Sequence, residues 1–198
     1  MGASELILKA AVYAADAHSS QRRKGLDEPY VNHPLRVACL ASACGLSEMA
    51  IVAALLHDVV EDTPRRFEDL ENEFPARAVA LVRLLTKWWP DDAEMDIKRQ
   101  ENPKYYGAIA GDPEAVAIKL LDRTDNLRDM HRMLPRARGW ARRYLNRSAD
   151  ECSPLIEFTA NDAVARHYRS ALDALSQALE DSEAPPSEGG ARGPIDPS

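Results

Sequence analysis

The chain has 198 residues and a formal net charge of −7, with 45% of its residues hydrophobic and 29% charged. This length and composition fit one soluble domain that is large enough to bury a core. The acidic balance argues against general nucleic-acid binding, because such binding relies on cationic side chains. No apolar run approaches membrane-spanning length and no signal-peptide pattern is present, so we expect a cytoplasmic protein with no membrane partner.

The N-terminal half of the chain has the apolar spacing of short amphipathic helices. Ser4 is a candidate N-cap for the first helix, and Pro34 fits the first turn of the second. The third helix begins at Ser47, carries aliphatic residues into His57 and ends before Pro64. The expected helices cover residues 4–17, 34–44, 47–62 and 67–74, with an amphipathic stretch at 79–85 and a loop at 21–30.

The C-terminal half is also helical in pattern and contains no alternating strand pattern, so we predict an all-α fold. Asp112 and Pro113 form a strong helix start, because an acid at the N-cap and a proline at the first helical position both favour initiation. Pro103 interrupts or divides a helix over residues 94–110. The other expected helices cover residues 113–130, 140–152 and 155–179, with a loop at 135–139.

The last residues of the chain differ in composition from the rest. Residues 181–198 are dominated by Pro, Gly, Ser and Glu, which cannot bury enough apolar surface to order a chain. We therefore predict one domain over residues 1–180 followed by a disordered tail. Deletion of the chain after about Leu179 is expected to leave activity intact.

A basic segment lies within this acidic chain between Lys119 and Arg147. It contains nine Lys or Arg residues against three Asp. Such a segment can receive an anionic small molecule, although a solvated helix face has the same charge pattern. The charge alone does not decide between these two interpretations.

Ionisable residues stand beside apolar runs at three places in the chain. His33 opens one apolar helix, His57 and Asp58 close another, and Asp122 interrupts a third apolar run. Buried ionisable groups are costly unless they are paired or bind a metal. Two imidazoles and two carboxylates suit Mn²⁺ or Fe²⁺, and four protein ligands leave positions open for water and substrate. A histidine at a helix start and a His-Asp dipeptide are also common without any metal.

Two further acids follow the His-Asp pair. Glu61 lies four residues after His57, and Asp62 lies four after Asp58, so each pair shares a face if the helix continues. One acid could take a proton from an attacking water while the other orients the water or assists the leaving group. Plain turn chemistry before a Thr-Pro pair would also place acids here.

Together these motifs resemble the HD-domain metal-dependent phosphohydrolases, whose pattern is H…HD…D in an all-helical chain. The flanking residues are similar to the hydrolase half of RelA/SpoT enzymes and, given the chain length, to the stand-alone small alarmone hydrolases. The resemblance covers about residues 1 to 134. The stretches that carry it are Gln21–Lys24, Glu28–Pro34, Leu56–Thr63 and Lys119–Arg128.

The resemblance implies an HD-domain helical bundle and an activity. That activity is the Mn²⁺-dependent removal of the 3′-pyrophosphate from ppGpp or pppGpp, which gives GDP or GTP. Glu61 and Asp62 match the family's residues that handle the attacking water. The residues that match its metal ligands are His33, His57, Asp58 and Asp122. The residues that match its nucleotide contacts are Arg23, Lys24, Asn126 and Arg128.

The sequence departs from the family pattern after the last metal ligand. The family usually reads Leu-Ala-Asp-Arg-Leu-X-Asn, with His often at X, whereas this chain has Leu121, Thr124 and Asp125. Asp125 adds a carboxylate one turn from Asp122, which could favour a different metal or repel a heavily phosphorylated substrate. The loop between Gly25 and Glu28 also varies within the family, so an adenine alarmone, (p)ppApp, remains an alternative substrate.

Two other functions fit the same motifs. One is an HD phosphohydrolase acting on another nucleotide, such as a deoxynucleoside monophosphate. The other is a non-catalytic HD protein that senses a nucleotide or neutralises a toxin. We expect a small-molecule nucleotide as the partner and either a monomer or a homodimer.

Overall fold

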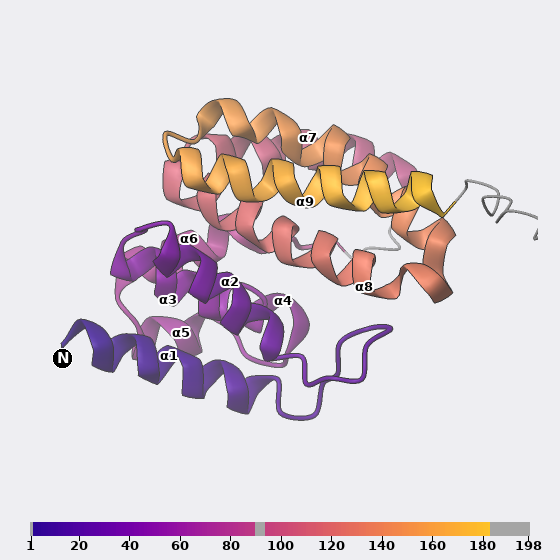
Figure 1. The fold of residues 1–198 in the computed structure, drawn as a ribbon. Helices are drawn as coiled ribbons and strands as arrows, with labels where there is room; N and C mark the ends of the chain where they lie inside the picture. Colours follow the sequence, from indigo (N-terminus) through magenta and orange to yellow (C-terminus); the bar gives the residue numbers. More distant parts are fainter. Residues whose placement is uncertain (1, 90–93, 183–198) are drawn as a thin grey trace, which may run out of the picture.

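The computed structural model describes residues 2–89 and 94–182, and within them the chain is helical (Figure 1). The predicted all-α fold is confirmed, because the β-type pairing among these residues is limited to an isolated bridge between Arg22 and Pro29. All but the first two residues of the predicted tail lie outside the described residues. The elements are α1 Ala3–Ala17, α2 Asn32–Ala43, α3 Glu48–Leu56, α4 Val59–Asp62, α5 Phe67–Glu73, α6 Ala76–Leu85, α7 Met95–Ala110, α8 Pro113–Cys152, the 3₁₀ helix η1 Ser153–Phe158 and α9 Asp162–Asp181.

Helix α8 is central to the fold. It packs against α7 and α9, and it also packs against α2, α3 and α6. Figure 1 shows the first helices of the chain as one layer and α7, α8 and α9 as a second layer above it. The helices that carry the predicted site residues therefore meet where the two layers join.

Helix α3 lies inside the first layer. Its residues from Val52 to Leu56 are at most 2% exposed, and the helix packs against α1, α2, α6 and α8. A helix that is apolar on every side must be covered on every side to be stable. The His-Asp pair thus begins where this deeply buried helix ends.

The helix expected over residues 47–62 is interrupted at His57 and Asp58. Helix α3 ends at Leu56, and the four-residue α4 begins at Val59. Nδ1 of His57 lies 2.8 Å from the carbonyl oxygen of Ala54, which fixes the imidazole against the last turn of α3. The predicted stop is confirmed, since Thr63 is extended ahead of Pro64.

Three expected features of the C-terminal half are wrong. Helix α7 continues through Pro103. The loop expected at 135–139 is a kink within α8, where only Ala137 leaves helical angles (φ −138°, ψ 31°). Pro135 precedes the kink, and a proline bends a helix because it has no amide hydrogen to donate. Helix α8 nevertheless continues beyond the kink, and it packs against α9. The helix expected over 155–179 is divided, because Asn161 caps a new helix by accepting from two backbone N–H groups.

No helix among the described residues is both long enough and apolar enough to cross a membrane.

Candidate metal centre and substrate cavity

A cavity of about 450 Å³ opens where α2, the α3–α4 junction and α8 meet. Every sequence-predicted site residue except Arg128 lines it. The loop before α2 and the second half of α8 supply cationic and aromatic side chains to its walls. The lining residues are Arg23, Lys24, Tyr30, His33, His57, Asp58, Glu61, Asp62, Leu85, Lys87, Lys119, Asp122, Arg123, Asn126, Asp129, Met130, Met133, Trp140, Tyr144 and Arg147.

Two histidines and a carboxylate converge on one point of this cavity. Ligand atoms of His33, His57 and Asp58 all lie within 4.8 Å of one another. Nε2 of His57 is 3.3 Å from Oδ1 of Asp58, and Nε2 of His33 is 3.6 Å from its Oδ2. Both histidines are buried. The chain therefore brings together His33 of α2 with His57 and Asp58 of the turn between α3 and α4.

Asp122 joins this cluster from the N-terminal half of α8. Its Oδ1 lies 3.2 Å from Nε2 of His33 and 3.8 Å from Nε2 of His57. Lys119 donates to Oδ2 at 2.8 Å, and the Asn126 amide donates to Oδ1 at 2.5 Å. Burial would raise the pKa of Asp122, but Lys119 and the histidines outweigh it and hold that pKa well below its usual range. Asp122 is therefore ionised.

A divalent cation fits this cluster. Nε2 of His57 is buried and makes no hydrogen bond to any described residue, as expected for an imidazole nitrogen that serves as a metal ligand. Burial lowers the pKa of His57, but the charges of Asp58 and Asp122 outweigh it and raise that pKa to about 9. The cluster thus favours positive charge, and its two imidazoles and two carboxylates are a donor set for Mn²⁺, Fe²⁺ or a similar ion.

Tyr30 connects the cluster to Asp62. Its hydroxyl oxygen lies 2.7 Å from Oδ2 of Asp58 and 2.7 Å from Oδ2 of Asp62. A phenol donates only one hydrogen, so both contacts are hydrogen bonds only if one carboxyl also carries a proton. Desolvation and the charge of Asp58 raise the pKa of Asp62. Asp62 is therefore the carboxyl suited to hold that proton.

Glu61 lines the cavity beside the cluster, and its Oε2 accepts the backbone N–H of Lys87 at 2.8 Å. The side chain is accessible to solvent. Surrounding protein atoms nevertheless displace much of its hydration, and together with the charge of Asp58 they raise the pKa of Glu61 to about 7. A carboxyl that titrates near neutrality can both accept and return a proton.

Arg23 and Lys24 reach the cavity from the loop before α2. Arg23 forms an ion pair with Asp129 at 2.9 Å and donates to Oδ1 of Asn126 at 2.6 Å. Nζ of Lys24 lies 5.3 Å from the ring centre of Trp140. Asn126 therefore connects Arg23 to Asp122 through hydrogen bonds. The sequence predicted only a substrate contact for Asn126.

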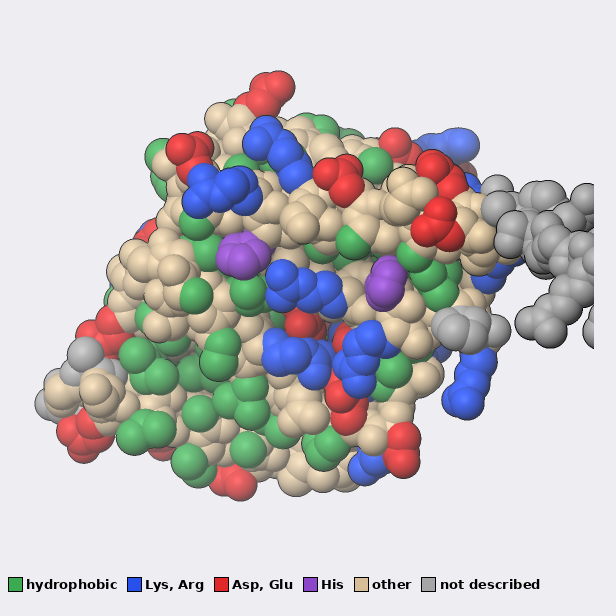
Figure 2. Space-filling view, viewed as in Figure 1, with side chains coloured by type: hydrophobic (Ala, Val, Ile, Leu, Met, Phe, Trp, Pro, Cys, Tyr) green, Lys and Arg blue, Asp and Glu red, His purple; other side chains and the backbone are tan. Residues whose placement is uncertain are grey.

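Arg128 lies apart from the other predicted residues. It is exposed and lines a separate hollow between α2 and α8, together with Arg36 and Arg132. Figure 2 shows cationic and acidic side chains interleaved on this face of the molecule. The structure does not bring Arg128 into the cavity, so its predicted contact with the nucleotide has no support from the geometry.

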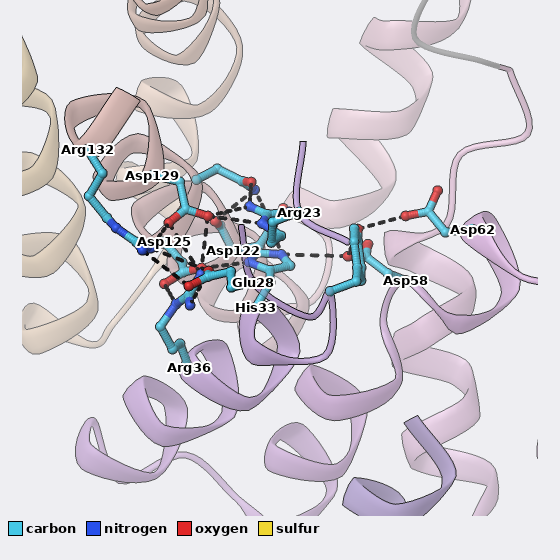
Figure 3. A network of polar contacts seen from close by, with 12 residues as sticks. Arg23, Glu28, His33, Arg36, Asp58, Asp62, Asp122, Asp125, Asp129 and Arg132 are labelled. Carbon is cyan, nitrogen blue, oxygen red and sulfur yellow. Dashed lines mark hydrogen bonds and ion pairs between the residues drawn. The ribbon is translucent and has the colours of Figure 1, made fainter. Parts of the chain in front are cut away.

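Asp125 also points away from the cavity. It is 1% exposed, and it contacts the hollow on the other side of α8. Burial alone would raise its pKa, but the hydrogen bond with His33 and the ion pair with Arg36 lower it (Figure 3). Asp125 is therefore a paired internal carboxylate, and its charge does not face a bound substrate.

Several cavity residues have no role in the sequence-based prediction. Lys119 stands three residues before Asp122 on one helix, and this spacing alone could have indicated the ion pair. Tyr30 belongs to the Glu28–Pro34 motif, yet its contacts with two acids depend on α4 and are not visible in the sequence. Trp140 and Tyr144 reach the cavity only because α8 resumes after its kink.

The family model of the HD domain matches residues 10–146 of the chain. This chain belongs to the HD-domain family.

Its relatives include alarmone hydrolases. Guanosine-3′,5′-bis(diphosphate) 3′-pyrophosphohydrolase MESH1 of Drosophila melanogaster is 42% identical over 131 residues, which are 65% of this chain and 70% of the relative. The bifunctional (p)ppGpp synthase/hydrolase SpoT of Escherichia coli (strain K12) is 33% identical over 171 residues, which are 84% of this chain but 23% of the relative. The chain thus matches most of the first protein and only a limited part of the second.

The fold is also similar to a solved structure of a metazoan ortholog of SpoT that hydrolyzes ppGpp. The two structures have a TM-score of 0.61 and 30% sequence identity, and the match covers 90% of this chain and 96% of the other. The expected HD-domain bundle is therefore confirmed by sequence and by structure.

Proposed function

We propose that this protein is a small alarmone hydrolase that removes the 3′-pyrophosphate from (p)ppGpp. The observation that carries the proposal is the convergence of His33, His57, Asp58 and Asp122 at one wall of a cavity that also contains Glu61 and cationic side chains. The named activity of MESH1, which resembles this chain over most of its own length, supports the same substrate class. The protein would act in the cytoplasm, as a monomer or a homodimer.

The four residues of the cluster would hold one divalent ion, which we propose to be Mn²⁺. The absence of thiolate ligands from the cluster favours Mn²⁺ or Fe²⁺ over a structural zinc. When bound, the ion supplies Lewis acidity, because it withdraws charge from phosphoryl oxygens and makes water more acidic. Lys119 keeps Asp122 ionised and oriented for this role.

The acids beside the cluster would move the protons of the reaction. The oxygen of water forms a bond to the phosphorus joined to the ribose 3′-oxygen. The bond between that phosphorus and the ribose oxygen breaks, so the ribose oxygen is the leaving group and pyrophosphate is released. Glu61, with its pKa near neutrality, takes the proton from water. Asp62, with a raised pKa and a contact to Tyr30, supplies a proton to the ribose oxygen.

Cations around the cavity would bind the phosphates and the base. Lys24, whose ammonium group lies over the Trp140 ring, comes from the loop before α2 and would offer its charge to the nucleotide. Arg23 is held by Asp129 and packs its guanidinium 5.4 Å from the Tyr30 ring centre, so it would present an edge and a planar face to the base. These positions would retain the nucleotide while its 3′-pyrophosphate reaches the cluster.

The direct test is pyrophosphate release from ppGpp and ppApp, measured side by side with Mn²⁺ and then with EDTA. We expect release that requires Mn²⁺ and that His57→Ala abolishes. His131→Ala is the matched control, because His131 is an exposed histidine of α8 outside the cavity lining. The ratio of the two rates gives the preferred base.

Two results would contradict the proposal. Turnover of a deoxynucleoside monophosphate without any release from ppGpp or ppApp would assign a different HD phosphohydrolase activity. Stoichiometric binding of Mn²⁺ and nucleotide with no turnover of any nucleotide would assign a binding protein.

A further inference from the structure

Asp125 contacts His33 on the side of the imidazole that faces away from the cavity. Nδ1 of His33 lies 2.7 Å from Oδ2 of Asp125, while Nε2 of the same ring lies 3.2 Å from Oδ1 of Asp122 and 3.6 Å from Oδ2 of Asp58. Figure 3 shows His33 between these carboxylates. Nδ1 of His33 therefore contacts Asp125, whereas Nε2 faces the predicted metal ligands Asp58 and Asp122.

The Asp125–His33 contact controls which nitrogen of the imidazole carries a hydrogen. A neutral imidazole has one N–H and one lone pair, and a carboxylate at Nδ1 requires the hydrogen there. In the metal-bound protein the lone pair would then lie on Nε2, which faces the cluster. Carboxylates that accept from the second nitrogen of a ligating histidine both orient the ring and increase its basicity.

Arg36 makes a buried carboxylate at this position tolerable. Its Nε donates to Oδ1 of Asp125 at 2.7 Å and its Nη2 donates to Oδ2 at 3.0 Å. The same guanidinium also donates to Glu28 at 2.8 Å and forms an ion pair with Asp129 at 3.2 Å. A carboxylate that is 1% exposed needs such a partner, because an uncompensated buried charge is strongly destabilising.

We propose that Asp125 is a positioning residue that holds His33 with Nε2 presented to the metal, with Arg36 as the counter-ion of Asp125. This inference rests on the proposed metal-dependent function. It gives a role to the position where the chain departs from the usual pattern of alarmone hydrolases. Asp125 acts through His33 and does not itself touch the substrate.

The substitution Asp125→Asn tests the role with little change in size. The amide is uncharged and must place its NH2 group against either Nε of Arg36 or Nδ1 of His33, so one of these two donors loses its acceptor. Glu28→Gln is the matched control, because it removes a carboxylate from the same Arg36 guanidinium without contacting His33. Far-UV circular dichroism and thermal melting establish that both variants fold.

The first readout is the affinity of the metal-free protein for Mn²⁺, measured by titration calorimetry without nucleotide. We expect D125N to bind Mn²⁺ about 10–100-fold more weakly than the wild type, and E28Q to bind as the wild type does. Equal affinity of folded D125N and wild type, or equal weakening in both variants, would overturn the proposal. If the wild type itself binds no Mn²⁺, the proposed metal dependence fails separately.

The second readout is the imidazole ¹H–¹⁵N spectrum, recorded without metal. The wild-type spectrum by itself tests the proposal, and the spectra of the two variants provide the comparison. We expect an Nδ1–H signal of His33 that is protected from exchange with solvent. D125N should lose that protection and E28Q should retain it. A His33 whose Nδ1 carries no protected hydrogen in the wild type would overturn the proposal whatever the Mn²⁺ affinity.

Discussion

Single residues in the cavity differ in proton affinity although they are of the same chemical type. Asp122 has a pKa well below its usual range because Lys119 and the histidines outweigh its burial. Glu61 and Asp62 have raised pKa values because desolvation and the charge of Asp58 both disfavour ionisation. Neighbouring carboxyls with separated pKa values can serve as metal ligand, base and acid in one site.

Replacing Glu61 by Gln should separate proton transfer from metal binding. The amide oxygen can still accept the Lys87 N–H, but it cannot take a proton from water. We expect kcat to fall by about 10²–10⁴-fold with Mn²⁺ affinity retained. Pyrophosphate release at saturating Mn²⁺ and calorimetric titration measure the two quantities. The control is Glu68→Gln at an exposed position of α5, and an unchanged kcat in E61Q would remove Glu61 from the mechanism.

At the scale of elements, the start of α8 fixes the register of the helix that carries Asp122. Oδ1 of Asp112 accepts the backbone N–H groups of Glu114 and Ala115 at 3.0 and 3.2 Å. Arg77 of α6 also donates to Asp112 at 2.5 Å. This single side chain therefore ends the preceding loop, caps α8 and joins it to the other layer.

Asp112→Ala should destabilise the protein by about 1–2 kcal/mol at neutral pH through loss of the cap. Asp112→Asn is the control, because it keeps the capping oxygen and loses only the partly exposed ion pair, for which we expect a smaller loss. The hydrogen bond from Arg77 is the main reason that the pKa of Asp112 is lowered. The contribution of the Asp112–Arg77 ion pair to the free energy of unfolding is therefore fully present above the unfolded pKa of Asp112, about 3.9. It is lost as the pH falls through the lower pKa that Asp112 has in the folded protein. Urea unfolding at pH 7 and at successively lower pH measures this, and a difference between wild type and D112N that grows on acidification would contradict it.

The loop before α2 depends on Gly25 at the cavity edge. Its φ of +79° is unfavourable for other residues, and a Cβ there would overlap Sδ of Met133, a cavity residue. We expect Gly25→Ala to displace Met133 and the adjoining Lys24, and so to raise KM for ppGpp more than it lowers kcat.

Gly45→Ala is the matched control for this loop. Gly45 also has a positive φ, +71°, but a Cβ there would meet no atom within 4 Å. Both variants should lose about 1–2 kcal/mol of stability through backbone strain, whereas KM should change only in G25A. A similar KM in the two variants would show that the loop does not shape the cavity.

At the scale of the whole molecule, the cavity exists only because two helical layers meet. His33 and His57 come from the layer of α1 to α6, and Asp122 comes from α8, which also packs against α9. The charged contacts continue across the junction, since Arg23 and Arg36 of the first layer pair with Asp129 of the second. Site geometry and the packing of the layers are thus coupled.

Removing residues 183–198 should leave the melting temperature and pyrophosphate release unchanged. The described core closes with Leu175 and Leu179, which are fully buried in α9. A longer deletion, after Ala174, removes both leucines and should cost more than about 4 kcal/mol, since each buried leucine contributes about 2–5 kcal/mol. Thermal melting and activity assays compare the two truncations. Loss of activity in the shorter truncation would give residues 183–198 a function.

The sequence by itself determined the helical class, most helix starts and the residues of the cluster. Apolar spacing and caps such as Asp112 act over a few neighbouring residues, so their effect is readable in a short window. The His-Asp motif was also readable, because ionisable groups beside an apolar run are conspicuous. The break after Leu56 was not predicted, and the kink at Ala137 was predicted as a loop, because the packing of α3 and α8 against several other helices is not visible in a short window.

Only the tertiary structure decided what each cavity residue contacts. His33 and Asp125 are 92 positions apart, and no local pattern indicates that Nδ1 of one meets the carboxylate of the other. The same holds for Tyr30 between two acids and for Arg128 outside the cavity. Residue spacing specifies which side chains share a helix face. The orientation of a ring or a guanidinium depends instead on which helices pack against that face. The packing of the helices in turn depends on the burial of apolar surface from the entire chain.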